Sequence, residues 1–238
     1  MVEPALVNRI LEALPEAARA RMLLDLSPVA LRQSVLLADV GAPLRQIIFP
    51  TTAAVSLVTS TADGSSVEAV LIGNEGVVGT WSASGIEMSP WRTIVQAGGE
   101  AYQMPPEAFR HHMQEQPSLA LLVARYNVAA HLLTSQSAAC NRFHELTARA
   151  ARWLLMVRDR TGSETLTLTQ EFLSQMLGAY RPSVTVALRG LDATGLIEVR
   201  RNRIAIVDPV GLEKLACECY AIGRAQAGEL LRLNGGLE

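Results

Sequence analysis

The residues best suited to chemistry lie between positions 166 and 207, where arginine and hydroxyl side chains recur. Five arginines and three acidic residues give this segment a net charge of +2, whereas the whole chain carries −2. The planar fork of donors on arginine matches phosphates and the edge of guanine. This local charge predicts a surface that contacts nucleic acid, and it excludes a basic coat over the whole chain.

A helix, a tight turn and a second helix are expected to position these side chains. Thr169 is a suitable N-cap for the first helix, and Gly178 can take the positive φ that ends it. Pro182 is tolerated in the first turn of the second helix. The polar residues expected to face outward on that helix are Arg181, Ser183, Thr185 and Arg189. A helix–turn–helix places such a face in the major groove of DNA.

Two short β-type runs, 196–200 and 203–207, follow the second helix, with Arg201-Asn202 as the turn between them. This hairpin is typical of the wing of a winged helix, where arginines meet the phosphate backbone. The alternative, a helical hairpin with a solvated charged face, leaves the order of turn, polar face and basic wing unexplained. The predicted DNA contacts are Thr169, Gln170, Arg181, Ser183, Thr185, Arg189, Arg201 and Arg203.

The first hundred residues predict short helices over 4–26 and then many short strands over 31–104. Asp63-Gly64 lies between two β-rich runs and is a strong hairpin signal. Strands this short and this closely spaced suggest a small antiparallel barrel or jelly roll.

A long helix is expected over 117–140, with apolar residues spaced alternately by three and four. Such a heptad seam can face the barrel of its own chain or a second copy of the helix. Small Ala129 and polar Gln136 favour a close helix pair, and symmetric dimers suit paired DNA half-sites. The predicted dimer interface is Leu119, Leu122, Tyr126, Ala129 and Leu133.

The whole chain is therefore expected to be an α+β protein with an N-terminal antiparallel jelly-roll barrel, a long dimerisation helix and a C-terminal winged helix–turn–helix. The expected boundaries are 1–116 for the barrel with its flanking helices, 117–143 for the dimerisation helix and 144–238 for the DNA-binding domain. No signal peptide and no membrane-spanning run is visible, which favours a cytoplasmic location without membrane contact.

This order resembles the Crp/Fnr family of bacterial transcription regulators, most specifically over Thr169–Ile197. The resemblance places Arg181 on the guanine-reading arginine of that family. Pro182 stands where many members have Glu, and Val186 stands where a later arginine is common. The resemblance therefore implies a base preference different from the best-known one in the family.

In nucleotide-binding members, a Gly-Glu pair and an Arg–Ser/Thr pair hold the ribose and the cyclic phosphate. By resemblance, Gly79-Thr80 and Arg92-Thr93 occupy these positions and are the expected effector-binding residues. Thr80 lacks the carboxylate that binds the ribose hydroxyl, so cyclic AMP is not the expected ligand. Another nucleotide, another small molecule or no ligand remain alternatives.

Metal and enzyme chemistry receive little support from the sequence. Cys140 lies far in sequence from Cys217 and Cys219, so neither an iron–sulfur cluster nor another metal site is expected. His131 is isolated on its helix. Residues 31–104 contain no histidine or cysteine for a cupin-type metal site, and no catalytic motif is present.

The sequence thus predicts a homodimeric regulator that binds double-stranded DNA and is controlled by a small effector at the barrel. RNA polymerase is a further candidate partner. An effector-independent regulator of the same fold, and a ligand-binding module that acts only on protein partners, are the alternatives.

Overall fold

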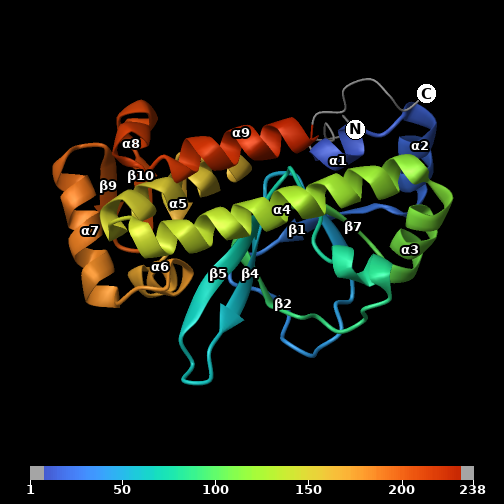
Figure 1. The fold of residues 1–238 in the computed structure, drawn as a ribbon, viewed down its shortest axis with the longest axis horizontal. Coiled ribbons are helices and arrows are strands. Elements are labelled where there is room, and N and C mark those ends of the chain that lie inside the picture. Colours follow the sequence, from blue (N-terminus) through green and yellow to red (C-terminus); the bar gives the residue numbers. More distant parts are fainter. Residues whose placement is uncertain (1–7, 232–238) are drawn as a thin grey trace.

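The N-terminal part of the chain forms a two-sheet antiparallel barrel in the computed structural model, which describes residues 8–231 (Figure 1). Residues 1–7 and 232–238 of the two predicted terminal domains lie outside this range. Two helices, α1 (Arg9–Glu12) and α2 (Glu16–Asp25), precede the sheets. The first sheet contains, in order, β1 (Ser27–Leu31), β7 (Gly99–Met104) and β3 (Ile47–Pro50). The second contains β2 (Leu36–Ala38), β6 (Arg92–Ala97), β4 (Ala54–Ser60) and β5 (Ser66–Ile72).

The hairpin between β4 and β5 forms where Asp63-Gly64 predicted it. Gly64 has a φ of +85°, which an L side chain rarely adopts. The Asp63 carboxylate accepts a hydrogen bond from the backbone N–H of Ser65 at 3.1 Å. The chain then pairs antiparallel from Ser60 opposite Ser66. The predicted antiparallel barrel is confirmed, and its strands divide between the two sheets.

Helix α4 (Pro117–Phe143) follows α3 (Pro106–Glu115) and runs along most of the length of the molecule (Figure 1). Its N-terminal half packs on the barrel, where Leu119, Leu122 and Tyr126 join the apolar core. Its C-terminal half packs against α9 (Cys219–Leu231), a helix that the sequence pattern did not predict. The two halves of α4 are therefore covered by different parts of the same chain.

The predicted dimer seam on α4 faces its own chain, which corrects the expectation of a subunit interface there. Leu119, Leu122, Tyr126 and Ala129 are at most 4% exposed in the single chain. Leu133 is half-buried and points at Gly223 of α9, where an added Cβ would come within 2.9 Å of its Cδ2. Heptad spacing identifies a buried face but not the surface that covers it, and here the barrel and α9 cover it.

A different stripe of α4 is left exposed. Leu121, Val128 and Leu132 are 37%, 52% and 36% exposed, respectively. Their spacing of seven and four residues puts them on one side of the helix. This stripe is an apolar surface that α4 still offers to a partner, apart from exposed Phe143 at the end of the helix.

The C-terminal part of the chain folds around a second apolar core. Its helices are α5 (Leu146–Thr161), α6 (Gln170–Leu177), α7 (Arg181–Ala193) and α8 (Pro209–Leu215). Its sheet has the order β8 (Thr165–Thr167), β10 (Arg203–Ile206) and β9 (Ile197–Arg200). Leu154 of α5, Leu173 of α6 and Leu188 of α7 are all buried in this core. The predicted wing is present and gains β8 as a third strand.

The two parts pack directly on each other. Helix α6 contacts β5. An added Cβ on Gly178 would meet the Val67 side chain at 3.0 Å, so the turn of the helix–turn–helix lies tightly on the barrel. Among the described residues, every helix is too short or too polar to cross a lipid bilayer.

Candidate nucleic-acid interface

The turn between α6 and α7 is fixed by the local signals that the sequence carries. The Thr169 side chain caps α6 and accepts a hydrogen bond from the backbone N–H of Phe172 at 3.1 Å. Gly178 ends α6 with a φ of +55°. Pro182 lies in the first turn of α7, where its missing N–H costs no helical hydrogen bond. These three residues determine the direction in which α7 leaves the core.

The outward face of α7 carries the predicted polar side chains. Arg181, Ser183 and Arg189 are exposed, whereas Val184 and Leu188 on the opposite face are buried. Arg181 lies 3.6 Å from the Glu171 carboxylate, and both side chains are more than half exposed. Water screens such a pair, so the Arg181 guanidinium stays available to a ligand.

The side chains of Thr185 and Gln170, both predicted to contact DNA, form a hydrogen bond with each other. The Thr185 hydroxyl donates to Oε1 of Gln170 at 2.7 Å and lies 3.1 Å from the carbonyl oxygen of Arg181. Both residues are half-buried. This contact ties the start of α6 to the first turn of α7 and sets the angle between the two helices.

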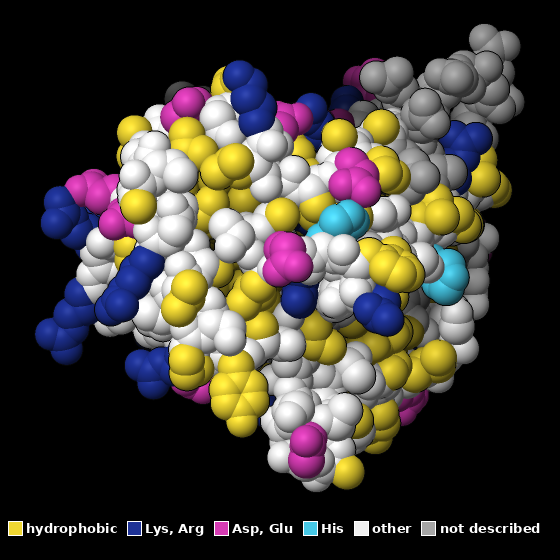
Figure 2. All heavy atoms as spheres, turned by 60° about the vertical axis from the view of Figure 1, so that its left-hand side comes forward, with side chains coloured by type: hydrophobic (Ala, Val, Ile, Leu, Met, Phe, Trp, Pro, Cys, Tyr) yellow, Lys and Arg dark blue, Asp and Glu magenta, His cyan; other side chains and the backbone are white. Residues whose placement is uncertain are grey.

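The wing presents its arginines beside the start of α7. Asn202 has a φ of +57° and forms the tight turn between β9 and β10. Arg200 is paired with Glu198, and Nη2 of Arg203 donates to the Thr165 hydroxyl at 3.4 Å. The Arg201 side chain makes no hydrogen bond or ion pair with any residue in the described range. Figure 2, which turns this end of the molecule forward, shows Lys and Arg side chains projecting at the left edge.

A groove of about 410 Å³ separates the wing from the start of α6 and α7. Its lining includes Thr169, Gln170, Arg181 and Arg201. The structure therefore brings four of the eight predicted DNA-contacting residues to a single concavity. The remaining four lie beside it: Ser183, Thr185 and Arg189 on α7, and Arg203 on β10.

Two apolar residues of this surface were not among the predicted contacts. Tyr180, the N-cap residue of α7, is 83% exposed, and Val186 on α7 is 70% exposed. Exposed apolar side chains at a helix N-terminus suit contact with a thymine methyl group in the major groove. The sequence signal for Val186 is its helical spacing of three residues from both Ser183 and Arg189.

A cavity of about 380 Å³ lies between β4, β5 and α4, at the expected effector position. Its walls are mainly apolar and aromatic, with Trp81, Trp91 and Tyr126 among the lining residues. Thr80 also lines it and donates a hydrogen bond to Oδ1 of Asn127 on α4 at 3.0 Å.

The other three expected effector residues lie outside the lining of this cavity. Gly79 starts the short 3-10 helix η1 (Thr80–Ser84) with a φ of +98°. Arg92 is exposed at the start of β6. Thr93 is buried and donates to the carbonyl oxygen of Trp91 at 3.3 Å. Within the described part of the chain, the residues that line the cavity include no arginine, so no guanidinium is placed there to bind a cyclic phosphate.

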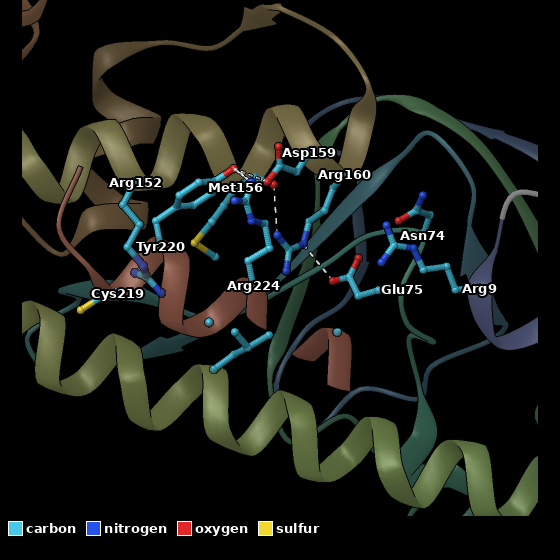
Figure 3. Close-up of a pocket in the computed structure, with 13 residues that line it drawn as sticks. Arg9, Asn74, Glu75, Arg152, Met156, Asp159, Arg160, Cys219, Tyr220 and Arg224 are labelled. Carbon is cyan, nitrogen blue, oxygen red and sulfur yellow. Dashed lines mark hydrogen bonds and ion pairs between the residues drawn. The ribbon is translucent and has the colours of Figure 1, made fainter. Parts of the chain in front are cut away.

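A separate cleft of about 290 Å³ lies where α5, α9 and the loop after β5 meet (Figure 3). Arg160 of α5 binds the Glu75 carboxylate at 2.9 Å, and both side chains are nearly buried. The Tyr220 hydroxyl donates to Asp159 at 2.6 Å, and the Arg224 guanidinium lies 5.1 Å from the Tyr220 ring centroid. These contacts join the barrel loop, the DNA-binding domain and α9, so the cleft acts as a junction between domains.

The three cysteines are adjacent in space, which corrects the view that their separation in sequence keeps them apart. Sγ of Cys140 lies 3.4 Å from Sγ of Cys217, although 77 positions separate them in sequence. Sγ of Cys219 lies 3.4 Å from Nδ1 of His144. The available sequence signals were Cys140 and His144 four residues apart on one helix and the Cys-x-Cys pair at 217–219.

Comparisons with known proteins agree with this geometry. Residues 148–215 match the model of the Crp-like helix-turn-helix domain. A search of curated proteins found no match. Among solved structures, the fold is similar to a protein from Eubacterium rectale assigned to the crp/fnr family of transcriptional regulators. That pair has a TM-score of 0.65 and 15% identity over 87% of this chain and 96% of the other.

Two further solved structures show the same fold. The c-di-GMP responsive global regulator CLP of Xanthomonas campestris has a TM-score of 0.65 and 16% identity, over 81% of this chain and 99% of that one. A transcriptional regulator of the CRP family from Thermus thermophilus has a TM-score of 0.64 and 21% identity, over 79% of this chain and 96% of that one.

The chain therefore has the fold of these regulators, and residues 148–215 carry a Crp-like helix-turn-helix domain. The predicted fold class and the predicted type of helix–turn–helix are confirmed. Each of the three similar proteins is described as a regulator.

Proposed function

We propose that this protein is a homodimeric regulator of transcription that reads DNA with α7 and holds the phosphate backbone with its wing. The observation that carries the proposal is the single surface formed by exposed Arg181, the capped start of α6 and Arg201 of the wing. A helix N-terminus favours phosphate, and a planar guanidinium favours guanine. We take the domain limits as 1–116, 117–143 and 144–238, and the location as cytoplasmic.

The polar residues of this surface divide into two roles. Arg181, Ser183 and Arg189 project from α7 and read base edges in the major groove. Thr169, Arg201 and Arg203 surround the groove beside the wing and bind phosphates. Gln170 and Thr185, which bind each other, hold the two helices at the angle that docking requires.

The exposed stripe of α4 is the proposed subunit interface. Leu121, Val128 and Leu132 remain open to solvent, whereas Leu119, Leu122 and Tyr126 are covered by the barrel. A parallel pair of such helices buries this stripe on both copies and sets the distance between two recognition helices. RNA polymerase is the proposed further partner on promoter DNA.

The proposed effector is an apolar or aromatic small molecule in the cavity between the barrel and α4. Trp81, Trp91 and Tyr126 offer ring faces and edges, and Thr80 with Asn127 offers a polar group at one wall. Since α4 forms one wall, a ligand there contacts the same helix that carries the dimer stripe. Effector control thus acts by shifting α4 between preexisting positions.

The test is binding of full-length protein to a randomised operator library at two salt concentrations. Arg181→Ala is expected to flatten base preference at one position of each half-site, because a bidentate contact to guanine discriminates by about 1–3 kcal/mol. Arg203→Ala is expected to weaken binding to all sequences and to lower the salt slope by about one unit.

Arg21→Ala serves as the control, because Arg21 is exposed on α2 in the barrel part. It should leave both base preference and salt slope unchanged. Uniform loss of affinity in Arg181→Ala, with base preference intact, would show that α7 does not read bases. Absence of salt-dependent DNA binding in the unmodified protein would favour a module that acts only on protein partners.

A further inference from the structure

Four potential metal ligands converge at the C-terminal end of α4. Cys140 lies in the last turn of α4, and His144 is its C-cap residue. Cys217 lies between α8 and α9, and Cys219 is the first residue of α9. One ligand atom from each residue lies within 4.8 Å of all the others. All three cysteines are buried and none forms a disulfide in the described range.

The spacing of these atoms fits one ion rather than a cluster of ions. A tetrahedral zinc site with Zn–S of about 2.3 Å and Zn–N of about 2.0–2.1 Å places neighbouring ligand atoms about 3.5–3.8 Å apart. The Cys140–Cys217 and Cys219–His144 pairs are each 3.4 Å apart. An iron–sulfur cluster would bind the ligands through different iron atoms and hold them further from one another than this arrangement allows.

The histidine is already oriented for coordination. Nδ1 of His144 faces Sγ of Cys219, while Nε2 lies 3.1 Å from the Glu218 carboxylate. A carboxylate that accepts the distal N–H fixes the tautomer in which the other ring nitrogen is a free ligand. Glu218 lies between the two cysteines in sequence, so one short segment supplies two thiols and the group that orients the imidazole.

The surrounding charge also fits an anionic site. Arg152 is 6% exposed, and Arg149 is half-buried on the same helix, α5. Within residues 8–231 neither forms an ion pair with a carboxylate, and the Nε atom of each is buried without a hydrogen-bond partner. Buried charges in proteins are normally compensated. A divalent ion with three thiolates carries a net charge of −1 and supplies part of that compensation.

We propose that Cys140, His144, Cys217 and Cys219 bind one zinc ion in a tetrahedral Cys₃His site. Three thiolates and one imidazole are a ligand set that selects zinc, and four protein ligands leave no open position for substrate. Binding releases the thiol protons as the thiolates form. The ion is therefore structural, and it joins the end of α4 to the segment that connects α8 with α9.

The position of the site gives it a role in the arrangement of the domains. Helix α9 packs along the C-terminal half of α4, and α5 and α8 belong to the DNA-binding domain. The ion fastens the start of α9 to α4 at the point where the long helix gives way to that domain. Its loss releases α9 from α4 and loosens the placement of the winged helix.

The experiment is metal analysis of the full-length protein purified under reducing conditions. We expect about one zinc ion per chain, and X-ray absorption showing sulfur neighbours at about 2.3 Å and a nitrogen neighbour at about 2.0–2.1 Å. His144→Gln and Cys217→Ser should bind zinc at least tenfold more weakly. Glu218→Gln, which keeps all four ligands, should weaken binding by about 10–100-fold.

His111→Gln is the matched control, because His111 is exposed on α3 and far in sequence from the site. It should keep full zinc content. Because Cys217→Ser places a hydroxyl in a buried position and can misfold, far-UV circular dichroism and the His144→Gln variant accompany it. A folded, reduced protein that takes up no zinc from excess zinc salt would overturn the proposal. So would iron with labile sulfide, a Cys140–Cys217 disulfide in place of metal, or unchanged zinc affinity in His144→Gln.

Discussion

The two halves of α4 are held in place by different chemistry. The N-terminal half is covered by apolar contacts, with Leu119, Leu122 and Tyr126 in the core of the barrel. The C-terminal half meets thiols, an imidazole and two arginines that lack carboxylate partners in the described structure. Apolar packing stabilises a helix whether or not metal is present. A cluster of metal ligands stabilises it only when metal is bound and the thiols are reduced.

The two halves of α4 are therefore suited to different roles. On the proposed function, the half beside the barrel would transmit the position of a ligand in the cavity, because α4 forms one wall of that cavity and packs densely on the barrel. The half beside α9 can be released without opening the barrel core. On the two proposals together, the chain would have a rigid sensor end and a metal-dependent end next to the helix–turn–helix domain.

The largest expected loss of stability comes from removing apolar contacts between the N-terminal half of α4 and the barrel. Leu122 is 1% exposed, and truncation to alanine leaves a cavity in the barrel core. Leu122→Ala should lower the free energy of unfolding by about 2–5 kcal/mol. Denaturant unfolding measures this, and Leu24→Ala is the control because Leu24 is 84% exposed on α2. A loss below about 1 kcal/mol would mean that α4 does not depend on this packing.

Removing zinc from the proposed site at the C-terminal end of α4 should lower the free energy of unfolding by a smaller amount. Zinc held at about 100 times its dissociation constant stabilises the folded chain by about 2.7 kcal/mol, which a chelator removes. The cost of Leu122→Ala should be the same with and without chelator, because distant sites are additive. Cys140→Ala should make the protein insensitive to chelator. Equal chelator sensitivity in unmodified protein and Cys140→Ala would place the ion elsewhere.

The same contrast explains how much the sequence could predict. The helix–turn–helix and wing rest on local signals: the Thr169 cap, the Gly178 turn and the Asn202 turn act within a few residues of themselves. These signals were sufficient because backbone geometry at caps and turns depends on single side chains. The Asp63-Gly64 hairpin was predicted for the same reason.

What the sequence did not predict depends on contacts between distant segments. The periodicity of α4 showed a buried face, but only the fold shows that the barrel and α9 cover it. Cys140 and Cys217 come together through the packing of α9 on α4, for which no local pattern exists. The effector cavity likewise excludes Arg92, because the register of β6 places that residue at an exposed strand end.

The exposed stripe crosses both halves, so the subunit interface should be sensitive to a charge near its middle. Val128→Glu places a carboxylate in the proposed dimer contact, where desolvation without a partner is unfavourable. We expect the dimer dissociation constant to rise by about tenfold or more, equivalent to ~1.4 kcal/mol. Sedimentation over a concentration series measures it, and Val210→Glu on α8 is the control. An unchanged dimer in Val128→Glu would move the interface away from α4.

The smallest expected effect concerns Glu68, which lies between the barrel and α5. Its carboxyl accepts hydrogen bonds from the Ser56 hydroxyl at 2.6 Å and from Nε1 of Trp153 at 3.0 Å. Burial raises the pKa of Glu68 above its ordinary value, and these hydrogen bonds offset part of that rise. The folded state therefore keeps the proton at pH values where the unfolded chain has lost it. Stability from this group is full below the ordinary pKa, and it falls as pH rises toward the raised pKa.

Glu68→Gln cannot ionise and should lose this dependence on pH. The variant should match the unmodified protein at low pH and exceed its free energy of unfolding at pH 8. Unfolding in urea at several pH values measures the difference, with Glu115→Gln on the exposed side of α3 as control. Lower stability of Glu68→Gln at pH 8 would show instead that the carboxylate is ionised and binds the neighbouring arginines of α5. The contact between the barrel and α5 would then depend on an ion pair at Glu68.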